Sequence, residues 1–250
     1  MFYPDLDLDL YAPGGEDFLK EAAAVAHLPK GSVVLEIGAS AGFGSIYLAK
    51  EYGVKATATD INPAWLTIIK QRALSKKVNR NIATSAQDVL KLSFRKGTFD
   101  FALANGVLFL TDKAGALRQI NRVLKNKGLL ILGEPLWLTD SPPAGLRSIL
   151  EVDGAEILTT DKYLQLFKEN GFELVFKKIY PSTLWENYYT PLQEKLSEWK
   201  ETNSPNLTKY STEIDLIIEE MEKVRSAGAG NLGYGMLIGR KTAEATFDLL

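Results

Sequence analysis

The sequence predicts a doubly wound α/β fold with a mostly parallel sheet of about seven strands. Short apolar, β-branched runs alternate with longer stretches of helical periodicity from Ser32 to Glu134. The first of these runs breaks into a glycine-rich loop that opens a helix. The chain has 250 residues, of which 46% are hydrophobic and 24% charged, and this suffices for one large α/β domain or two small ones.

The first predicted element is a helix, because EDFLKEAAAVAHL has apolar residues at helical spacing. Five apolar runs then predict strands over 33–38, 55–60, 80–85, 99–105 and 129–134. Helical patterns between them predict helices over 44–53, 62–76 and 113–128. The last of these ends in Lys-Gly before an apolar strand, which is an expected helix stop.

The pattern changes after Glu134. A Pro-rich loop, TDSPPAG, precedes a predicted helix over 160–171 and a strand over 172–180. About fifty residues of loop and charged helix, roughly 181–230, separate this strand from a final one over 233–241. Two strands separated by such an insertion predict one antiparallel strand at the edge of the sheet, with the helical insertion as a lid.

Composition excludes several classes of function. A net charge of −2 provides no electrostatic footprint for a phosphate backbone, so we expect no nucleic-acid partner. With no cysteine and His27 as the single histidine, thiol chemistry, disulfides and a Cys/His metal site are excluded, and we expect no metal. No apolar run approaches the roughly 20 residues that span a bilayer, and the amino terminus lacks a secretory signal. We therefore expect a cytoplasmic protein without a membrane partner, of unknown oligomeric state; the acidic arm DLDLDL and the end TAEATFDLL are expected to be surface segments.

The strongest local signal is VVLEIGASAGFGSIYLAK, a strand that breaks into a loop with Gly38, Gly42 and Gly44 and then opens a helix. Glycine lets a ligand approach the backbone closely, and the helix presents free N–H groups and a positive dipole end. The second strand ends in Asp60, whose carboxylate can accept hydrogen bonds from both hydroxyls of a ribose. Together these features predict a ligand that contains adenosine.

The spacing of the loop glycines is also that of the NAD(P) loop of short-chain dehydrogenases. Such an enzyme needs a tyrosine whose pKa is lowered by a lysine four residues later. None of the ten tyrosines is followed by a lysine at that spacing. The hydride-transfer alternative therefore lacks its acid/base residue.

Further motifs resemble the class I S-adenosylmethionine-dependent methyltransferase family, over about residues 15–135. The resemblance is carried by the loop from Glu36 to Gly44, by Asp60, by Asp88 in SAQDVLKL, and by FDFALANGVLFL and RVLKNKGLLILGEP. It implies a Rossmann-like methyltransferase fold and S-adenosylmethionine as the cofactor. The cofactor-binding residues that it implies are Glu36, Gly38, Ala39, Ser40, Gly42, Asp60, Ile61, Gln87, Asp88, Val89 and Asn105.

Two departures from the family pattern matter. Ser40 stands where the family usually has its middle glycine, and Asn126-Lys127-Gly128 keeps one glycine of the usual pair. Ser40 bears on how closely the loop approaches the methionine part of the cofactor, and so on affinity. The segments EPLWLTDSPP, LWENYYTPLQ and GYGMLIGRK also resemble a subgroup of small-molecule methyltransferases of uncharacterised function, which names no substrate.

A methyl acceptor is expected at the carboxyl ends of the strands, beside the cofactor's sulfonium. Methyl transfer mainly needs proximity and orientation, with a general base only where the nucleophile carries a proton. The candidate catalytic residues are Glu134, Trp137, Asp140, Glu186, Tyr188 and Tyr189. Trp137 and Trp185 fit lid packing equally well, and Glu186 fits a solvated charge. The aromatic cluster at 185–189 could also hold a cationic amine by cation–π attraction.

We therefore expect one methyltransferase domain over 1–250 that transfers a methyl group to an oxygen, nitrogen or carbon of a small molecule. Within it we expect an N-terminal arm and helix at 1–30, a cofactor-binding core at 31–135, a substrate side and lid at 136–230, and a final strand and tail at 231–250. The alternatives are a dehydrogenase that binds NAD(P), a catalytically silent protein that binds S-adenosylmethionine, and a methyltransferase that acts on a macromolecule.

Overall fold

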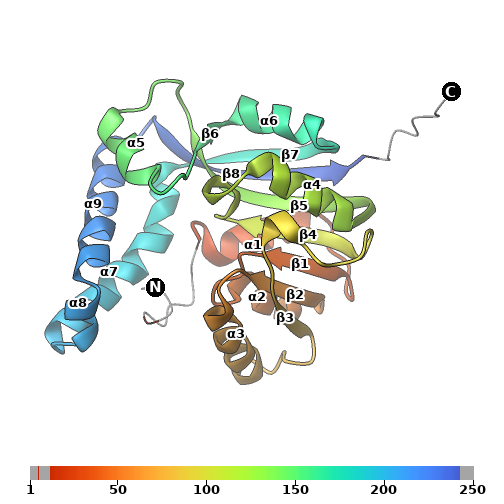
Figure 1. The fold of residues 1–250 in the computed structure, drawn as a ribbon, viewed down its shortest axis with the longest axis horizontal. Helices are drawn as coiled ribbons and strands as arrows, with labels where there is room; N and C mark the ends of the chain where they lie inside the picture. The colour runs from red at the N-terminus through yellow and green to blue at the C-terminus, as the bar shows by residue number, and fades with distance from the viewer. Residues whose placement is uncertain (1–4, 6–11, 243–250) are drawn as a thin grey trace.

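A computed structural model describes residue 5 and residues 12–242 (Figure 1). The predicted acidic arm, apart from Asp5, and the tail beyond Thr242 lie outside the described residues. The described chain forms one twisted sheet with helices on both faces, and a group of helices stands to one side of it (Figure 1).

The elements up to the fifth strand alternate between strand and helix. They are α1 (Gly15–Val25), β1 (Val33–Ile37), α2 (Phe43–Tyr52), β2 (Lys55–Asp60), α3 (Pro63–Ser75), β3 (Ile82–Ala86), β4 (Phe99–Asn105), α4 (Lys113–Val123) and β5 (Leu124–Trp137). The later elements are α5 (Ala144–Leu150), β6 (Leu158–Thr159), α6 (Thr160–Glu169), β7 (Phe172–Pro181), α7 (Glu186–Glu201), α8 (Pro205–Lys209), α9 (Ser211–Ala227) and β8 (Leu232–Lys241).

The strand order is β3-β2-β1-β4-β5-β8-β7, with the short β6 beside β5. β1 pairs in parallel with β2 on one side and with β4 on the other. From these central strands the chain winds outward in opposite directions, and a crevice therefore opens at the carboxyl ends of β1 and β4. The predicted doubly wound, mostly parallel sheet is confirmed.

The position of the antiparallel strand differs from the prediction. β8 pairs antiparallel with both β5 and β7, so it lies inside the sheet and β7 forms the edge. β8 is buried along almost its whole length, whereas β7 mixes buried and exposed residues. A strand buried on both faces is stable inside a sheet, and the prediction of an antiparallel strand at the edge was wrong for this reason.

Two other predictions needed correction. The helix predicted over 113–128 ends at Val123, because the chain passes directly into β5, whose pairing with β4 is irregular at its start. Lys127 has φ 62° there, a left-handed conformation that does not continue a helix. The stretch read as a Pro-rich loop leads into α5, and β6 adds a strand that is too short to be recognised by periodicity.

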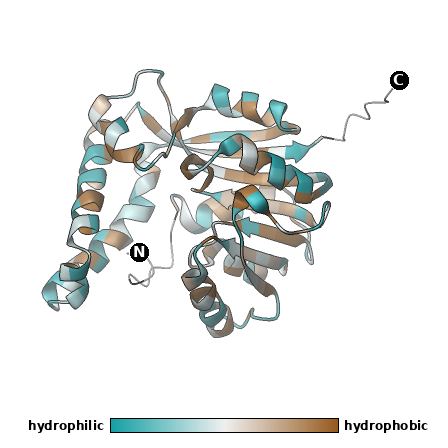
Figure 2. Cartoon of the chain, viewed as in Figure 1, coloured by the Kyte–Doolittle hydropathy of each residue, from teal (hydrophilic) through white to brown (hydrophobic). Residues whose placement is uncertain are grey.

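Apolar side chains fill both faces of the sheet, and Figure 2 shows hydrophobic residues along its central strands. Leu35 and Ile37 of β1 pack toward α4 and α6, while Val34 belongs to the cluster that includes α1 and α2. The helices α7 and α9 join this second cluster through buried residues such as Leu192 and Ile217. The helical insertion is therefore packed onto the same core as the sheet.

Within the described part of the chain, no helix is both long enough and apolar enough to cross a membrane. The same residues bring no three histidine or carboxylate side chains together in a way that could hold a metal ion.

Candidate active site

The loop between β1 and α2 is shaped by left-handed backbone positions. Gly38 has φ 61°, and a Cβ atom there would lie 2.5 Å from Cγ2 of Val107. Any side chain larger than hydrogen would collide with the loop that follows β4. Ser40 adopts φ 45°, a region costly for a residue other than glycine, and its backbone N–H donates to Asp60 Oδ2 at 3.0 Å. This bond stabilises a left-handed conformation that glycine would adopt without strain.

Glu36 anchors the start of α2. Its Oε2 accepts a hydrogen bond from the backbone N–H of Ser45 at 2.8 Å, and its Oε1 occupies the space that a Cβ at Gly44 would need. A carboxylate is stabilised at a helix N-terminus by the exposed N–H groups. Burial raises the pKa of Glu36 to about 7, against the hydrogen bonds from Ser45 and Gly44 that lower it.

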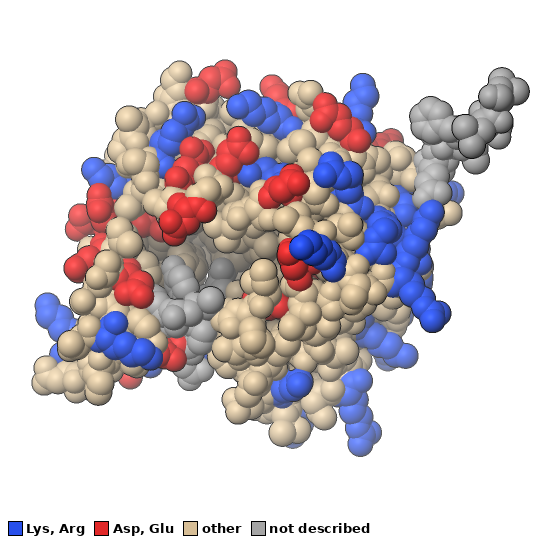
Figure 3. All heavy atoms as spheres, viewed as in Figure 1, with Lys and Arg blue, Asp and Glu red and all other residues tan. Residues whose placement is uncertain are grey.

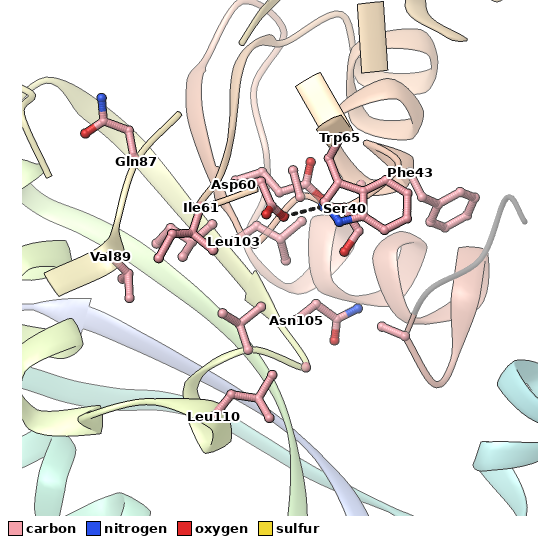
Figure 4. Close-up of a pocket in the computed structure, with 18 of the residues that line it drawn as sticks. Ser40, Phe43, Asp60, Ile61, Trp65, Gln87, Val89, Leu103, Asn105 and Leu110 are labelled. Atoms are coloured by element: carbon pink, nitrogen blue, oxygen red, sulfur yellow. Dashed lines mark hydrogen bonds between the residues drawn. The ribbon is translucent and has the colours of Figure 1, made fainter. Parts of the chain in front are cut away.

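Asp60 holds two loops at the carboxyl end of β2. One carboxylate oxygen accepts from Ser40 N and the other from Asn62 N at 2.9 Å. Burial raises the pKa of Asp60 above its ordinary value, although these backbone bonds act in the opposite direction. The backbone N–H of Ile61 also bonds to this carboxylate, which still has lone-pair capacity to accept a hydrogen bond from a ligand. Figure 4 shows Asp60 beside Ser40 at the wall of the cavity.

The segment after β3 supplies another wall. Asp88 Oδ1 caps a short 3-10 turn by accepting from Leu90 N at 2.9 Å, which leaves Oδ2 for a ligand. The side chain of Gln87 bonds to Ser85 and Ser93 at 2.9 Å each, and in Figure 4 it extends away from the centre of the cavity. Gln87 therefore contributes to the turn rather than offering a free amide.

These elements enclose a cofactor-sized cavity of about 360 Å³, which we call the first cavity. The predicted cofactor-binding residues that line it are Glu36, Gly38, Ala39, Ser40, Asp60, Ile61, Gln87, Asp88, Val89 and Asn105. Gly42 is not among them. A Cβ there would lie 2.9 Å from Ile69 Cγ1, so the absence of a side chain at Gly42 lets α3 pack closely against the loop. The sequence interpretation missed Phe43, Trp65 and Leu110, apolar residues without a motif position (Figure 4).

A second cavity, of about 430 Å³, adjoins the first and shares Ser40, Trp65, Gly106 and Leu110 with it. Its remaining walls come from the residues before α1, from the loop after β4, from α5 and the loop after it, from β5 and β8, and from the insertion at 181–230. They are Pro13, Phe109, Pro135, Ile149, Leu150, Val152, Ala155, Ile157, Trp185, Tyr188, Glu220 and Tyr234. Most of this surface is apolar.

Glu134 is completely buried and lines neither cavity. Its carboxylate accepts hydrogen bonds from the backbone N–H groups of Val107, Leu108 and Phe109, at 3.0, 2.7 and 2.8 Å, and from the hydroxyl of Tyr163 at 3.2 Å. Burial raises its pKa to about 7. Glu134 fixes the loop that carries Val107 and Phe109 into the two cavities, and its own side chain faces neither of them.

The other candidate catalytic residues are divided. Tyr188 lines the second cavity. Tyr189 is buried, and its hydroxyl donates to Glu220 Oε1 at 2.8 Å. The remaining three lie outside both cavities: Trp137 is buried and donates to Glu151 Oε1 at 2.8 Å, Asp140 is exposed, and Glu186 pairs with Arg225 at 2.8 Å.

Glu220 was missed by the sequence interpretation. It lies on α9, where Ile217 and Val224 are buried three positions before and four positions after it. A carboxylate at this spacing shares the inward face of an amphipathic helix. That position was a detectable signal, hidden within a helix that carries many charges.

Residues 34–128 match the family described as a methyltransferase domain. Phosphoethanolamine N-methyltransferase of Triticum aestivum is 22% identical over 231 residues, which are 91% of this chain and 45% of that protein. Sarcosine/dimethylglycine N-methyltransferase of Halorhodospira halochloris is 28% identical over 144 residues, 57% of this chain and 52% of the relative. The chain spans about half the length of these curated relatives.

Among solved structures, the fold is similar to that of an S-adenosylmethionine-dependent methyltransferase from Geobacter sulfurreducens, crystallised in complex with S-adenosyl-L-homocysteine. The TM-score is 0.79 at 20% identity, over 95% of this chain and 96% of the other. The resemblance predicted from the motifs is thus confirmed by the matched domain, and the Rossmann-like methyltransferase fold by the solved structure. Residues 34–128 are therefore similar to a methyltransferase domain, and the chain shares its fold with a solved S-adenosylmethionine-dependent methyltransferase.

Proposed function

We propose that this chain is an enzyme that transfers a methyl group from S-adenosylmethionine to a small molecule held in the second cavity. The observation that carries the proposal is the junction of the two cavities at Ser40, Trp65, Gly106 and Leu110. A methyl transfer needs donor and acceptor in line and in contact, with water excluded between them. Two adjoining cavities with apolar side chains at their junction supply that arrangement.

The charges of the first cavity favour S-adenosylmethionine over a dinucleotide. The charged residues that line it are Glu36, Asp60 and Asp88, and no lysine or arginine joins them among the described residues. S-adenosylmethionine carries a positive sulfonium and no phosphate, whereas NAD(P) carries a pyrophosphate, for which this lining offers no basic side chain. The absence of a Tyr-x-x-x-Lys sequence weighs against the dehydrogenase in the same direction.

The rim of the first cavity suits an adenine ring. Ile61 is 73% exposed there, although it is a large apolar side chain, and Val89 lies on the same cavity. A ring that covers Ile61 would remove this apolar surface from water, which is favourable. In this arrangement Asp60 accepts from the ribose hydroxyls and Asp88 Oδ2 from the adenine amino group.

The cofactor supplies an electrophilic methyl group. The protein's part is to position it: Gly38 and Ser40 bring the backbone close, and Trp65 and Leu110 exclude water at the junction. We propose that residues 1–250 form one domain and that the protein acts in the cytoplasm. The net charge of −2 supports a small molecule rather than a nucleic acid as the partner.

The proposal is tested by a radiometric assay of methyl transfer from S-adenosylmethionine to a metabolite library, together with the binding of S-adenosylhomocysteine. Asp60→Ala should weaken that binding at least tenfold, because a charge-assisted hydrogen bond contributes roughly 1.5–3 kcal/mol. Asp140→Ala is the matched control, since Asp140 is exposed and lines neither cavity. Equal affinity in Asp60→Ala and the parent protein would mean that the ribose site is elsewhere. Cofactor binding without turnover of any acceptor would favour the silent protein, and methylation of nucleic acid or protein alone would favour the macromolecular enzyme.

A further inference from the structure

We infer that the methyl acceptor is an amine on an apolar body, without a phosphate or carboxylate group, and that Glu220 binds its nitrogen. The inference rests on the proposed function, because it assigns the second cavity to the acceptor. It narrows the acceptor from any small molecule to one chemical class.

The second cavity has a single charged residue in its described lining, Glu220. Aliphatic residues from α5 and the loop after it, such as Ile149, Val152 and Ile157, form much of its wall. Trp185 and Tyr188 add aromatic surface. Such a cavity gains free energy by covering apolar carbon and offers one place for a charged or strongly polar group.

The Glu220 carboxylate is positioned for a ligand. Its Oε1 accepts the hydroxyl of Tyr189 at 2.8 Å, which fixes the side chain and leaves Oε2 for a second hydrogen bond. Tyr189 is itself fully buried and stacks on Trp185, with ring centroids 5.7 Å apart. Burial raises the pKa of Glu220, with only the Tyr189 bond acting against it. An ammonium group at Oε2 would provide the missing positive charge.

The surroundings of the cavity have the same sign. Between residues 181 and 230 the sequence has nine aspartates and glutamates and five lysines and arginines. Figure 3 shows acidic side chains gathered over the part of the molecule that holds α5 and α9, beside the hollow between these helices and the sheet. A negative rim attracts cations and repels anions, so it favours a cationic acceptor.

An acceptor with a phosphate or carboxylate would find no basic partner among the described residues that line the cavities. Neither cavity has a lysine or arginine in its described lining. Anionic groups held in proteins are usually met by arginine, lysine or several N–H donors. The inference therefore separates this chain from the substrates that name its relatives, phosphoethanolamine and sarcosine, and keeps only their amino group.

Glu220 would also take up a proton. An amine that arrives as ammonium loses one N–H proton to the carboxylate, and its free lone pair then forms the new carbon–nitrogen bond. The bond between the methyl carbon and sulfur breaks, and its electron pair stays on sulfur as a neutral thioether. The positive charge passes to the methylated nitrogen, and Glu220 releases its proton to water.

The first test is calorimetric titration of the full chain saturated with S-adenosylhomocysteine. The probes are 2-phenylethylamine, its uncharged analogue 2-phenylethanol, phosphoethanolamine and sarcosine. We expect the apolar amine to bind at least tenfold more tightly than the alcohol. Phosphoethanolamine and sarcosine, which carry a phosphate and a carboxylate group, should bind more weakly than either. Equal affinity of amine and alcohol, tighter binding of phosphoethanolamine or sarcosine, or no binding of 2-phenylethylamine would each overturn the inference. A failure of S-adenosylhomocysteine itself to bind would instead overturn the proposed function.

The second test compares Glu220→Gln with Glu219→Gln. Glu219 is a neighbouring exposed glutamate, and its substitution removes the same charge. Glu220→Gln should weaken the binding of 2-phenylethylamine at least tenfold and leave the affinity for S-adenosylhomocysteine unchanged. The unchanged affinity also shows that the variant is folded. Glu219→Gln should change neither. Tyr189→Phe should weaken the amine to a smaller extent, because it removes only the bond that orients the carboxylate. Unchanged amine affinity in Glu220→Gln, or an equal loss in both glutamine variants, would refute the assignment.

Discussion

Replacing Glu134 with alanine tests whether this buried carboxylate supports the active-site loop or takes part in the chemistry. Its two oxygens accept three backbone N–H groups, from Val107, Leu108 and Phe109, and the hydroxyl of Tyr163. These residues follow β4 directly and bring side chains into both cavities. In the alanine variant the donors lose their acceptor while they stay in the interior.

The cost can be worked out from this bond set. A buried donor left without a partner costs about 1–3 kcal/mol. Leu108 is fully buried and the other two N–H groups are partly accessible, so water can satisfy part of the loss. We therefore expect Glu134→Ala to lower the free energy of unfolding by about 3–5 kcal/mol, and Glu134→Gln by about half of that, because one amide oxygen still accepts.

Urea denaturation followed by tryptophan fluorescence measures this loss, with Glu219→Ala as a surface control that should stay within about 0.5 kcal/mol of the parent. S-adenosylhomocysteine affinity should fall together with stability, because the loop covers Gly38. A Glu134→Ala protein that loses less than about 1 kcal/mol and keeps its cofactor affinity, yet loses methyl transfer, would refute this reasoning and return Glu134 to a catalytic role.

Three further predictions concern the same region. Gly38→Ala should weaken the binding of S-adenosylhomocysteine at least tenfold, because the new Cβ collides with Val107. Gly31→Ala is the control: at φ 83° it imposes similar backbone strain, but no atom lies within 4 Å of its Cβ position. Equal effects of the two substitutions on cofactor affinity would contradict the steric argument. The free energy of unfolding should fall as pH rises from about 4.5 to 7, because burial raises the pKa of Glu36 and Glu134 to about 7. The folded protein then holds protons that the unfolded chain has released. The stability linked to these protons is complete below the ordinary pKa of 4.5 and is lost as each group ionises in the folded protein. Urea titrations across this range check the sign, and a rising stability would be inconsistent with buried neutral carboxyls. Tyr163→Phe should cost about 1 kcal/mol in the same denaturation assay, and a larger loss than in Glu134→Ala would show that the carboxylate is not the centre of the network.

The parallel half of the fold could be predicted because each βαβ unit carries its own local signal. The apolar runs that form β1, β2 and β4 bury both faces, and the helices between them have clear periodicity. The place of β8 could not be predicted in this way, because strand order depends on pairing between segments distant in sequence. Gly233, Gly235 and Gly239 lie on this strand, where close packing leaves no room for larger side chains, and that is a weak clue to an interior position.

The candidate site divides in the same manner. Asp60 ends β2, and Gly38 and Asp88 come shortly after the ends of β1 and β3. A parallel sheet brings such residues to one edge, so their motif spacing was informative. Glu134 lies inside β5, three residues before the strand ends, and its side chain points to the face where Tyr163 lies. The sequence alone does not state which face a side chain takes. Glu220 comes from a helix far along the chain, and only tertiary packing places it in the second cavity.

The measurement that tests the central claim most directly is a calorimetric titration of the full chain with S-adenosylhomocysteine and, separately, with NADP. The arrangement of Glu36, Asp60 and Asp88 around the first cavity predicts saturable binding of S-adenosylhomocysteine at a single site and no binding of NADP. Absence of heat with S-adenosylhomocysteine at millimolar concentration, or saturable binding of NADP at the same site, would contradict the account.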